Sequence, residues 1–140
     1  MANYSLAPLE LADFEAALAL WNASPGVRAA ETREEFTRIL ARNPGLGSAA
    51  WVDGELVGGV LCTHDGRRGY LYHLAVAAPF RQQKIATALV ERSLSLLASQ
   101  GISRCSIFLI ADNEAGAQFW LKTGWRERTD LRLMAIDLLP

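Results

Sequence analysis

The chain has 140 residues, of which 51% are hydrophobic and 21% charged, and its formal net charge is −1. This length and balance predict one globular domain over residues 1–140. A net charge near zero does not draw the whole protein to nucleic acid or to an anionic membrane, so neither is an expected partner. No metal site is expected. The sequence shows no signal peptide and no apolar run near the roughly 20 residues of a membrane span, which predicts a cytoplasmic protein.

The two cysteines are the candidates for reactive thiols. Cys62 and Cys105 lie far apart, outside CxxC spacing, and each belongs to an apolar run. A catalytic cysteine needs a base beside it, and none is evident near either residue. We therefore interpret both as buried small hydrophobic residues that stay reduced.

The first half of the chain predicts two helices followed by a β meander. In order, the pattern indicates a strand, two helices and three strands over residues 3–6, 11–21, 32–42, 48–52, 56–63 and 70–76. Thr32 to Glu35 matches a capping box at the start of the second helix. Asp53-Gly54 between the second and third strands is a strong hairpin signal.

The second half alternates helices and strands. The pattern indicates a helix, a strand, a helix and two strands over residues 85–98, 104–111, 114–122, 125–128 and 131–138. The strand over 104–111 is nearly all apolar, which is typical of a strand buried on both faces. The element order predicts a mixed α/β fold with a mostly antiparallel central sheet flanked by helices. The last two strands offer an edge through which a homodimer could form.

The junction between the strand over 70–76 and the next helix is the candidate ligand site. A helix N-terminus leaves several backbone N–H groups unpaired, and with the helix dipole these form a site suited to phosphate. Polar and cationic residues surround it at positions 81–84, and the small residues Ala86, Thr87 and Ala88 let a ligand approach the backbone. An ordinary strand-to-helix connection with solvated charges is the alternative.

Two segments resemble the signatures of the GNAT N-acetyltransferase superfamily. Residues 74–89 are similar to its acetyl-CoA signature, a hydrophobic strand ending in Val, then Pro and Arg/Gln-x-x-Gly-x-Gly/Ala at the start of a helix. Residues 113–125 are similar to the second signature, an Asn, a helix, an aromatic pair and a Gly-aromatic ending. The resemblance implies the GNAT fold, acetyl-CoA as cofactor, and direct transfer of acetyl to a primary amine of a small-molecule or peptidyl acceptor.

The resemblance also assigns residues to the cofactor. It implies that the strand over 70–76 and the strand before Asn113 splay apart, with the pantetheine arm in the gap and a backbone N–H near Val76 facing the oxyanion. The cofactor-binding residues that it implies are Leu74, Ala75, Val76, Arg81, Gln82, Gln83, Lys84, Ile85, Ala86, Thr87, Asn113, Gly116, Trp120 and Lys122.

Three positions depart from the family pattern. Lys84 replaces the central glycine, whose backbone freedom favours close approach to phosphate. Trp120 stands where many members carry a Tyr that acts as general acid, a role that an indole cannot fill. Phe108 stands where some members carry an acidic base. These departures leave open two alternatives: a catalytically weak acyl-CoA-binding or sensing protein, and a structural module in which Lys84 blocks the phosphate site.

Tyr72 and His73 are the candidates for proton transfer. Histidine titrates near neutral pH, which suits a base for an ammonium substrate. Strand alternation predicts Tyr72 on one face and His73 on the other. We expect Tyr72 and Trp21 to line the acceptor pocket. Open alternatives are a purely structural His73, deprotonation through water, and acidic residues near Glu31 that either attract an amine or are simply solvated.

Overall fold

The computed structural model describes residues 3–140. The chain divides into two compact units, Met1–Ile110 and Ala111–Pro140, which are described separately below. Across the described residues, none of the helices combines the length and the apolar character that crossing a bilayer requires.

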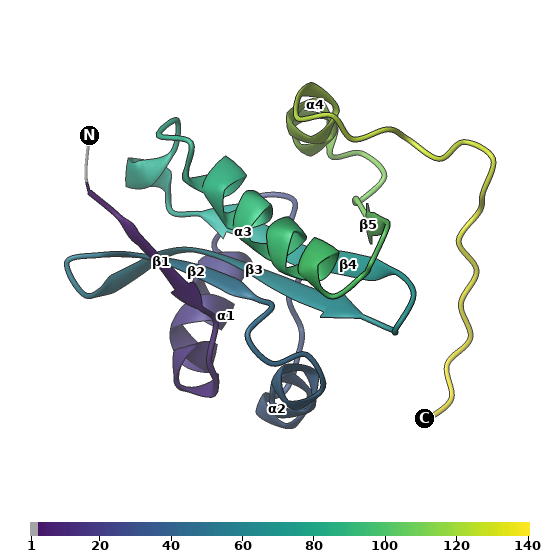
Figure 1. Ribbon diagram of the computed structural model, residues 1–140, viewed down its shortest axis with the longest axis horizontal. Helices are drawn as coiled ribbons and strands as arrows, with labels where there is room; N and C mark the ends of the chain where they lie inside the picture. Colours follow the sequence, from purple (N-terminus) through teal and green to yellow (C-terminus); the bar gives the residue numbers. More distant parts are fainter. Residues whose placement is uncertain (1–2) are drawn as a thin grey trace. The chain divides into compact units, whose positions relative to one another are not determined.

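The first unit is built on a five-stranded sheet (Figure 1). Its strands, in spatial order, are β1 Ser5–Pro8, β2 Ser48–Val52, β3 Glu55–His64, β4 Gly69–Val76 and β5 Cys105–Ile107. The first four pair antiparallel, and β5 pairs parallel with β4. The predicted mixed, mostly antiparallel sheet is confirmed.

Helices cover both faces of this sheet (Figure 1). The helical segments of the first unit are η1 Leu11–Asp13, α1 Phe14–Asn22, α2 Arg33–Arg42, η2 Ala78–Phe80 and α3 Ile85–Ser99. A Cβ added to Gly58 would meet Leu89 and Ile85 of α3, whereas Gly59 faces Trp21 of α1. Neighbouring residues of β3 thus face opposite layers, as the period of a strand requires.

Local sequence signals act as predicted at two places. Thr32 Oγ1 accepts a hydrogen bond from Glu35 N at 3.1 Å, and Glu35 Oε1 accepts one from Thr32 N at 3.0 Å, so the capping box starts α2. Asp53 and Gly54 both have positive φ, 49° and 77°, as a type I′ turn between β2 and β3 requires.

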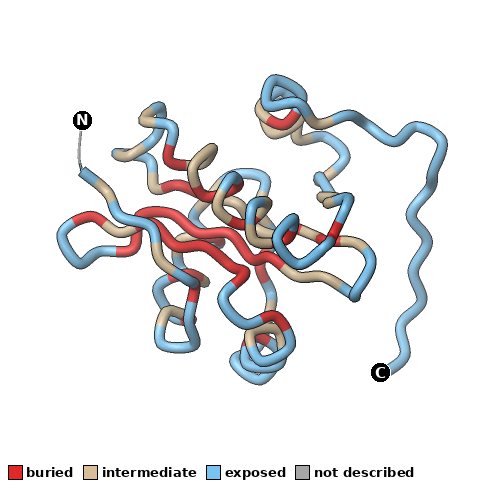
Figure 2. The backbone as a smooth tube through the Cα atoms, in the orientation of Figure 1, coloured by how far each residue is buried: buried red, intermediate tan, exposed pale blue. Residues whose placement is uncertain are grey.

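Buried hydroxyl groups fix α3 to the turn that precedes β2. Ser93 Oγ donates to the Leu46 carbonyl at 2.7 Å and lies 2.7 Å from Ser48 Oγ. Arg92 Nη1 donates to the carbonyl of Gly47 and to Ser48 Oγ, each at 3.0 Å. Figure 2 shows β2 and β3 largely buried beneath this helix. These contacts hold α3, and therefore its N-terminus, in one position over the sheet.

β5 is shorter and more exposed than predicted. It covers three half-buried residues instead of the strand buried on both faces expected over 104–111, and Phe108 is 53% exposed. Within the described chain β5 pairs with β4 alone, and that ladder ends at Leu71 and Ile107. Residues 108–111 have no neighbouring strand to bond with in the part of the chain that the structure describes, so the strand ends at Ile107.

The second unit contains α4, Glu114–Lys122, which starts and ends where predicted. The prediction of two final strands is wrong, because residues 125–140 contain no strand. Their large apolar side chains are exposed, Leu133 at 75% and Ile136 at 84%. A strand needs a hydrogen-bonding partner, and residues 111–140 contain no other strand that would supply one.

Candidate functional site

The gap between β4 and β5 begins in the middle of β4. Their parallel pairing runs from Gly69–Cys105 to Leu71–Ile107 and then stops. Farther along, β4 pairs through Ala75 and Val76 with β3 on its other side. Within residues 3–140, the β5-facing edge of this part of β4 therefore carries no strand, as the family resemblance implied.

The loop before α3 is held in an unusual backbone conformation. Gln82 and Lys84 have φ values of 62° and 65°, in the left-handed region that glycine adopts most readily. Lys84 is the residue that caps α3, and its side chain forms no cap hydrogen bond. The first helical bond runs from Ala88 N to Lys84 O at 3.1 Å. The N–H groups of the first helical turn precede this bond and have no acceptor within the helix, so they are candidate donors to an anion.

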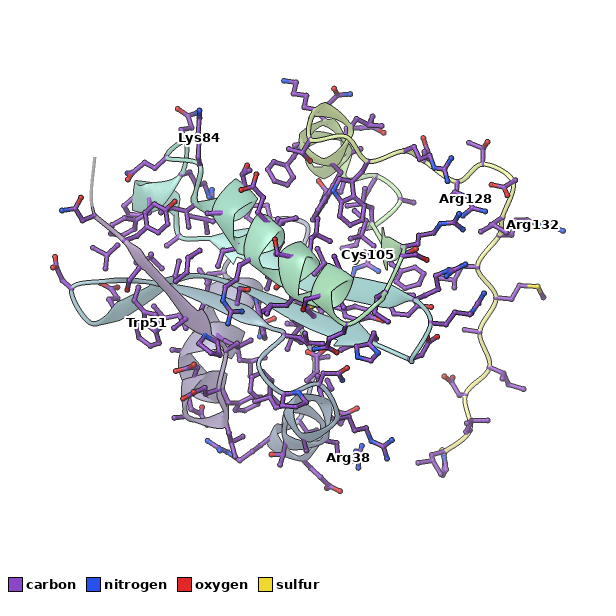
Figure 3. The ribbon with its side chains drawn as sticks, in the orientation of Figure 1. Arg38, Trp51, Lys84, Cys105, Arg128 and Arg132 are labelled. Carbon is purple, nitrogen blue, oxygen red and sulfur yellow. The ribbon has the colours of Figure 1, made fainter. Side chains whose placement is uncertain are left out.

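Arg81 and Lys84 bring positive charge to this helix start. Arg81 Nε donates to the Val76 carbonyl at 2.9 Å, which fastens the loop to the end of β4. Lys84 is exposed, and its side chain projects outward from the loop (Figure 3). The structure thus brings the end of β4, the loop and the first turn of α3 together at one place, as the sequence indicated.

A bulge in β4 changes which face His73 occupies. Leu61 pairs with Tyr72 and Gly59 with Ala75, so two residues of β4 lie opposite Val60 alone. His73 has a φ of 60°. The Tyr72 and His73 rings lie 6.3 Å apart. The prediction that strand alternation separates them is wrong, because the extra residue at the bulge interrupts the alternation.

His73 forms a short, largely buried hydrogen bond with Glu31, which lies just before α2. His73 Nε2 lies 2.6 Å from Glu31 Oε1, and the two side chains are 13% and 21% exposed. Burial raises the pKa of Glu31, but the hydrogen bond and the charge of His73, together with the backbone N–H groups of Ala30 and Glu31, outweigh it, so that the pKa is lowered overall. Glu31 is therefore a carboxylate at neutral pH. Sequence reasoning placed Glu31 among acidic residues that either attract an amine or are solvated, and it did not pair Glu31 with His73.

Tyr72 and its neighbours form an aromatic surface beside this pair. The Phe108 ring lies 6.0 Å from that of Tyr70 and 6.3 Å from that of Tyr72, and both pairs are stacked. Burial, followed by the nearby Tyr70, raises the pKa of Tyr72. The Tyr72 hydroxyl therefore remains protonated at neutral pH.

Trp21 occupies the core instead of the wall of an open pocket. Its side chain is wholly buried, and its Nε1 donates to the Gly59 carbonyl at 3.3 Å. The indole ring lies 5.2 Å from the His73 ring. Its part in the site, contrary to the sequence expectation, is to support His73 from the α1 side.

Neither cysteine is a nucleophile in this structure. Cys62 is buried and Cys105 is half-buried. Burial raises the pKa of Cys62 to about 12 and that of Cys105 to about 11. Both remain neutral thiols at physiological pH. The prediction of a buried cysteine is confirmed for Cys62, whereas Cys105 is only half-buried.

The second unit holds four of the residues assigned to the cofactor. Asn113 Oδ1 accepts a hydrogen bond from Gly116 N at 2.9 Å and so caps α4. A Cβ at Gly116 would overlap the Asn113 amide. Trp120 is buried, with its ring 4.8 Å from that of Trp125, and Lys122 is exposed. Glycine at position 116 thus leaves room for the capping amide.

Comparison with known proteins agrees with this geometry. The sequence model of the Acetyltransferase (GNAT) family matches residues 12–125. An acetyltransferase of Pectobacterium atrosepticum is 36% identical over 104 residues, which are 74% of each chain.

Solved structures show the same fold at lower identity. PaiA N-acetyltransferase from Thermoplasma acidophilum, in complex with coenzyme A, has a TM-score of 0.76 at 18% identity, covering 89% of this chain and 90% of that one. An aminoglycoside acetyltransferase from an uncultured soil metagenomic sample, in complex with sisomicin, has a TM-score of 0.77 at 16% identity and 97% coverage of both chains. The family match covers most of the chain and agrees with the gap between β4 and β5, so this protein belongs to the GNAT acetyltransferase family and uses acetyl-CoA.

Proposed function

We propose that this chain transfers acetyl from acetyl-CoA to a primary amine of a small-molecule or peptidyl acceptor, with residues 1–140 acting as one functional domain. The observation that carries the proposal is the start of α3. It has no side-chain cap, and two left-handed residues precede it, so that its N–H groups are open to an anion. The family match over residues 12–125 spans both compact units and supports a single functional domain.

The residues present fit the phosphate and pantetheine parts of acetyl-CoA. The first turn of α3, from Ile85 to Thr87, would bind the pyrophosphate through backbone N–H groups, with Arg81 and Lys84 adding positive charge. The unpaired edge of β4 would hold the pantetheine arm through backbone groups of residues 74–76. The assignment of Gln82 and Gln83, and of Asn113, Gly116, Trp120 and Lys122 in the second unit, stays a prediction from the family signatures.

When bound, acetyl-CoA supplies an acyl group activated as a thioester. The protein must then remove a proton from the amine and deliver one to the sulfur. The amine nitrogen forms the new bond to the acyl carbon as the carbon–sulfur bond breaks. The amine loses a proton, and the sulfur leaves as a thiolate that gains one. We assign His73, the histidine of the β4 bulge, as the acceptor of the proton that the amine loses. The protonated hydroxyl of Tyr72 is assigned as the donor of the proton that the sulfur gains. Tyr72 also borders the acceptor side through its stack with Phe108.

Calorimetric titration with acetyl-CoA and with CoA tests the cofactor site, and initial rates across an amine panel test turnover. The panel should contain polyamines, an aminoglycoside and peptides with a free N-terminal alanine. The last two follow from structural neighbours, an aminoglycoside acetyltransferase and a ribosomal-protein-alanine N-acetyltransferase. Micromolar binding together with turnover of one class supports the proposal. Binding without turnover anywhere in the panel would favour the acyl-CoA-sensing alternative, which the departures at Lys84 and Trp120 motivate.

A His73→Gln variant tests the assigned base. General-base catalysis contributes about 10²- to 10⁴-fold to a rate, so kcat should fall by roughly that factor. The affinity for CoA should be unchanged, because His73 lies on the face of β4 that meets α1. His64→Gln is the matched control, since His64 is a half-buried histidine at the end of β3 whose side chain bonds to Gln100. Equal kcat in His73→Gln and wild type would remove His73 from the mechanism and leave water as the proton acceptor.

We further propose a homodimer formed by the apolar C-terminal residues. The support is the row of exposed side chains from Leu131 to Leu139 and the lack of a strand partner within their own unit. Light scattering after size exclusion tests this, with Ile136→Asp as the disrupting variant. A monomer at all concentrations would overturn it.

A further inference from the structure

The hydrogen bond between Glu31 and His73 joins distant parts of the chain at a largely buried position. The two residues are 42 positions apart, and their side chains meet at 2.6 Å with little exposure. Trp21 packs against the His73 ring at 5.2 Å from the α1 side. His73 itself lies on a bulge in the left-handed region, where a residue with a Cβ is strained. Three elements therefore combine to hold one imidazole.

The carboxylate determines which imidazole nitrogen carries the proton. An ionised carboxylate only accepts hydrogen bonds, so Nε2 of His73 must donate to Glu31 Oε1. In the neutral ring the lone pair then lies on Nδ1. Within residues 3–140, Nδ1 forms no hydrogen bond. The nitrogen able to accept a proton is thus the one that the protein leaves unoccupied.

Glu31 also keeps an unused acceptor. Its Oε2 is buried and has no hydrogen-bond partner among the described residues. A buried unpaired carboxylate oxygen is unfavourable, and such groups are rare in native proteins. A contact that served only to attach the segment before α2 to the sheet would not require this arrangement.

We propose that Glu31 is the positioning residue of the acetyl-transfer site: it holds His73 as the Nε2–H tautomer, with Nδ1 as the proton acceptor, and stabilises the ring when it becomes charged. This rests on the proposed role of His73 as base. The titratable groups facing His73 are Glu31 from the segment before α2 and Tyr72 from β4 itself. The contact from α1 is Trp21, which does not titrate.

Nitrogen-15 NMR of the two histidine rings of the full chain tests the proposal without requiring turnover. His64 is the internal reference, and the spectrum of His64→Gln assigns the two rings. In the wild type, neutral His73 should show the Nε2–H pattern. In Glu31→Gln this pattern should weaken, because an amide can donate to Nε2 as well as accept from it and no longer fixes the tautomer. His64 should not move.

Enzyme kinetics of the wild type and the Glu31 variants, measured with an amine that the wild type acetylates, provide the second test. In Glu31→Gln the acidic limb of the kcat/KM profile should move to lower pH, and kcat near neutral pH should fall by about tenfold or more, as when a carboxylate no longer holds a histidine tautomer. The KM for acetyl-CoA should be unchanged. Glu34→Gln, which removes an exposed carboxylate paired with Arg38, is the matched control. Glu31→Asp, which keeps the charge, should retain the wild-type limb and serves if Glu31→Gln does not fold.

The outcomes separate the two proposals. An Nδ1–H tautomer in the wild type, or an unchanged His73 tautomer and an unchanged kcat/KM profile in Glu31→Gln with only a lower melting temperature, would overturn the positioning role and leave a structural contact. Absence of turnover in the wild type, with the expected NMR result, would overturn the enzymatic proposal while supporting the effect of Glu31 on His73.

Discussion

Lys84→Gly is the most informative single substitution, because the residue stands where the family signature has glycine and its backbone adopts a glycine conformation. Its φ and ψ are 65° and 18°, in the left-handed helical region. Lys84 also starts α3, since its carbonyl accepts the first helical hydrogen bond from Ala88. The side chain is exposed. Substitution therefore changes mainly the backbone energy and one positive charge.

The two backbone effects oppose each other, and their sizes decide the sign. The left-handed region costs a residue with a Cβ about 1–2 kcal/mol. Glycine has more conformational entropy than lysine in the unfolded chain, and this offsets about 0.5–1 kcal/mol of the strain that the substitution relieves. We expect Lys84→Gly to raise the free energy of unfolding by about 0.5–1 kcal/mol, or about 2–4 °C in melting temperature for a chain of this size.

Thermal and urea unfolding should be measured for the wild type, Lys84→Gly and Lys84→Ala. The alanine variant is the matched control, because it removes the same charge but keeps the Cβ and therefore the strain. It should differ from the wild type by no more than about 0.5 kcal/mol. A glycine variant no more stable than the alanine variant would refute the argument from backbone strain.

Titration of the same three proteins with acetyl-CoA separates the effect of the Lys84 charge on binding from the effect of its Cβ on the approach of the phosphates. Loss of an exposed ammonium near phosphate should weaken binding by about 0.2–1 kcal/mol, or roughly 1.5- to 5-fold, in Lys84→Ala. Binding by Lys84→Gly that is tighter than by Lys84→Ala would show that the Cβ at this position hinders the phosphates. Binding restored only by glycine, with none in the wild type, would refute the enzymatic proposal and favour a module that has lost its cofactor.

Three further outcomes are expected. Ser93→Ala should lower the free energy of unfolding by about 1–3 kcal/mol, because it leaves buried partners unpaired, whereas the exposed Ser95→Ala should change little; equal melting temperatures would contradict this. Cys62 and Cys105 should react with a thiol reagent at pH 8 far more slowly in the folded than in the urea-unfolded protein, because burial raises their pKa values to about 12 and about 11; equal rates would be contrary evidence. The folded-state pKa of Glu31 is lowered below its ordinary 4.5, so its stabilising contribution is present above 4.5 and is lost as the pH falls through the folded value. The stability difference between wild type and Glu31→Gln should accordingly shrink below that pH, and a difference that persists in acid would count against the ionised pair.

The sequence by itself determined the features that depend on a few neighbouring residues. The Thr32–Glu35 capping box and the Asp53-Gly54 turn were readable because each forms its bonds or backbone angles within four residues. The bounds of α4 follow from Asn113, which caps it, and from helical periodicity. The family signature predicts the ligand site at the start of α3, because the expected contacts lie in backbone groups that any strand–loop–helix junction presents.

Only the tertiary structure decided the surroundings of Tyr72 and His73, the residues proposed for proton transfer. The pairing of Glu31 with His73 joins residues 42 positions apart, and nothing local to either one indicates the other. The bulge that places Tyr72 and His73 together depends on the register between β3 and β4, which strand periodicity cannot reveal. The apolar patterns of residues 104–111 and 125–138 indicated strands, but most of these residues form none. A side-chain pattern shows that a segment can be extended, whereas a strand also needs a neighbouring backbone to bond with, and only the folded chain supplies one.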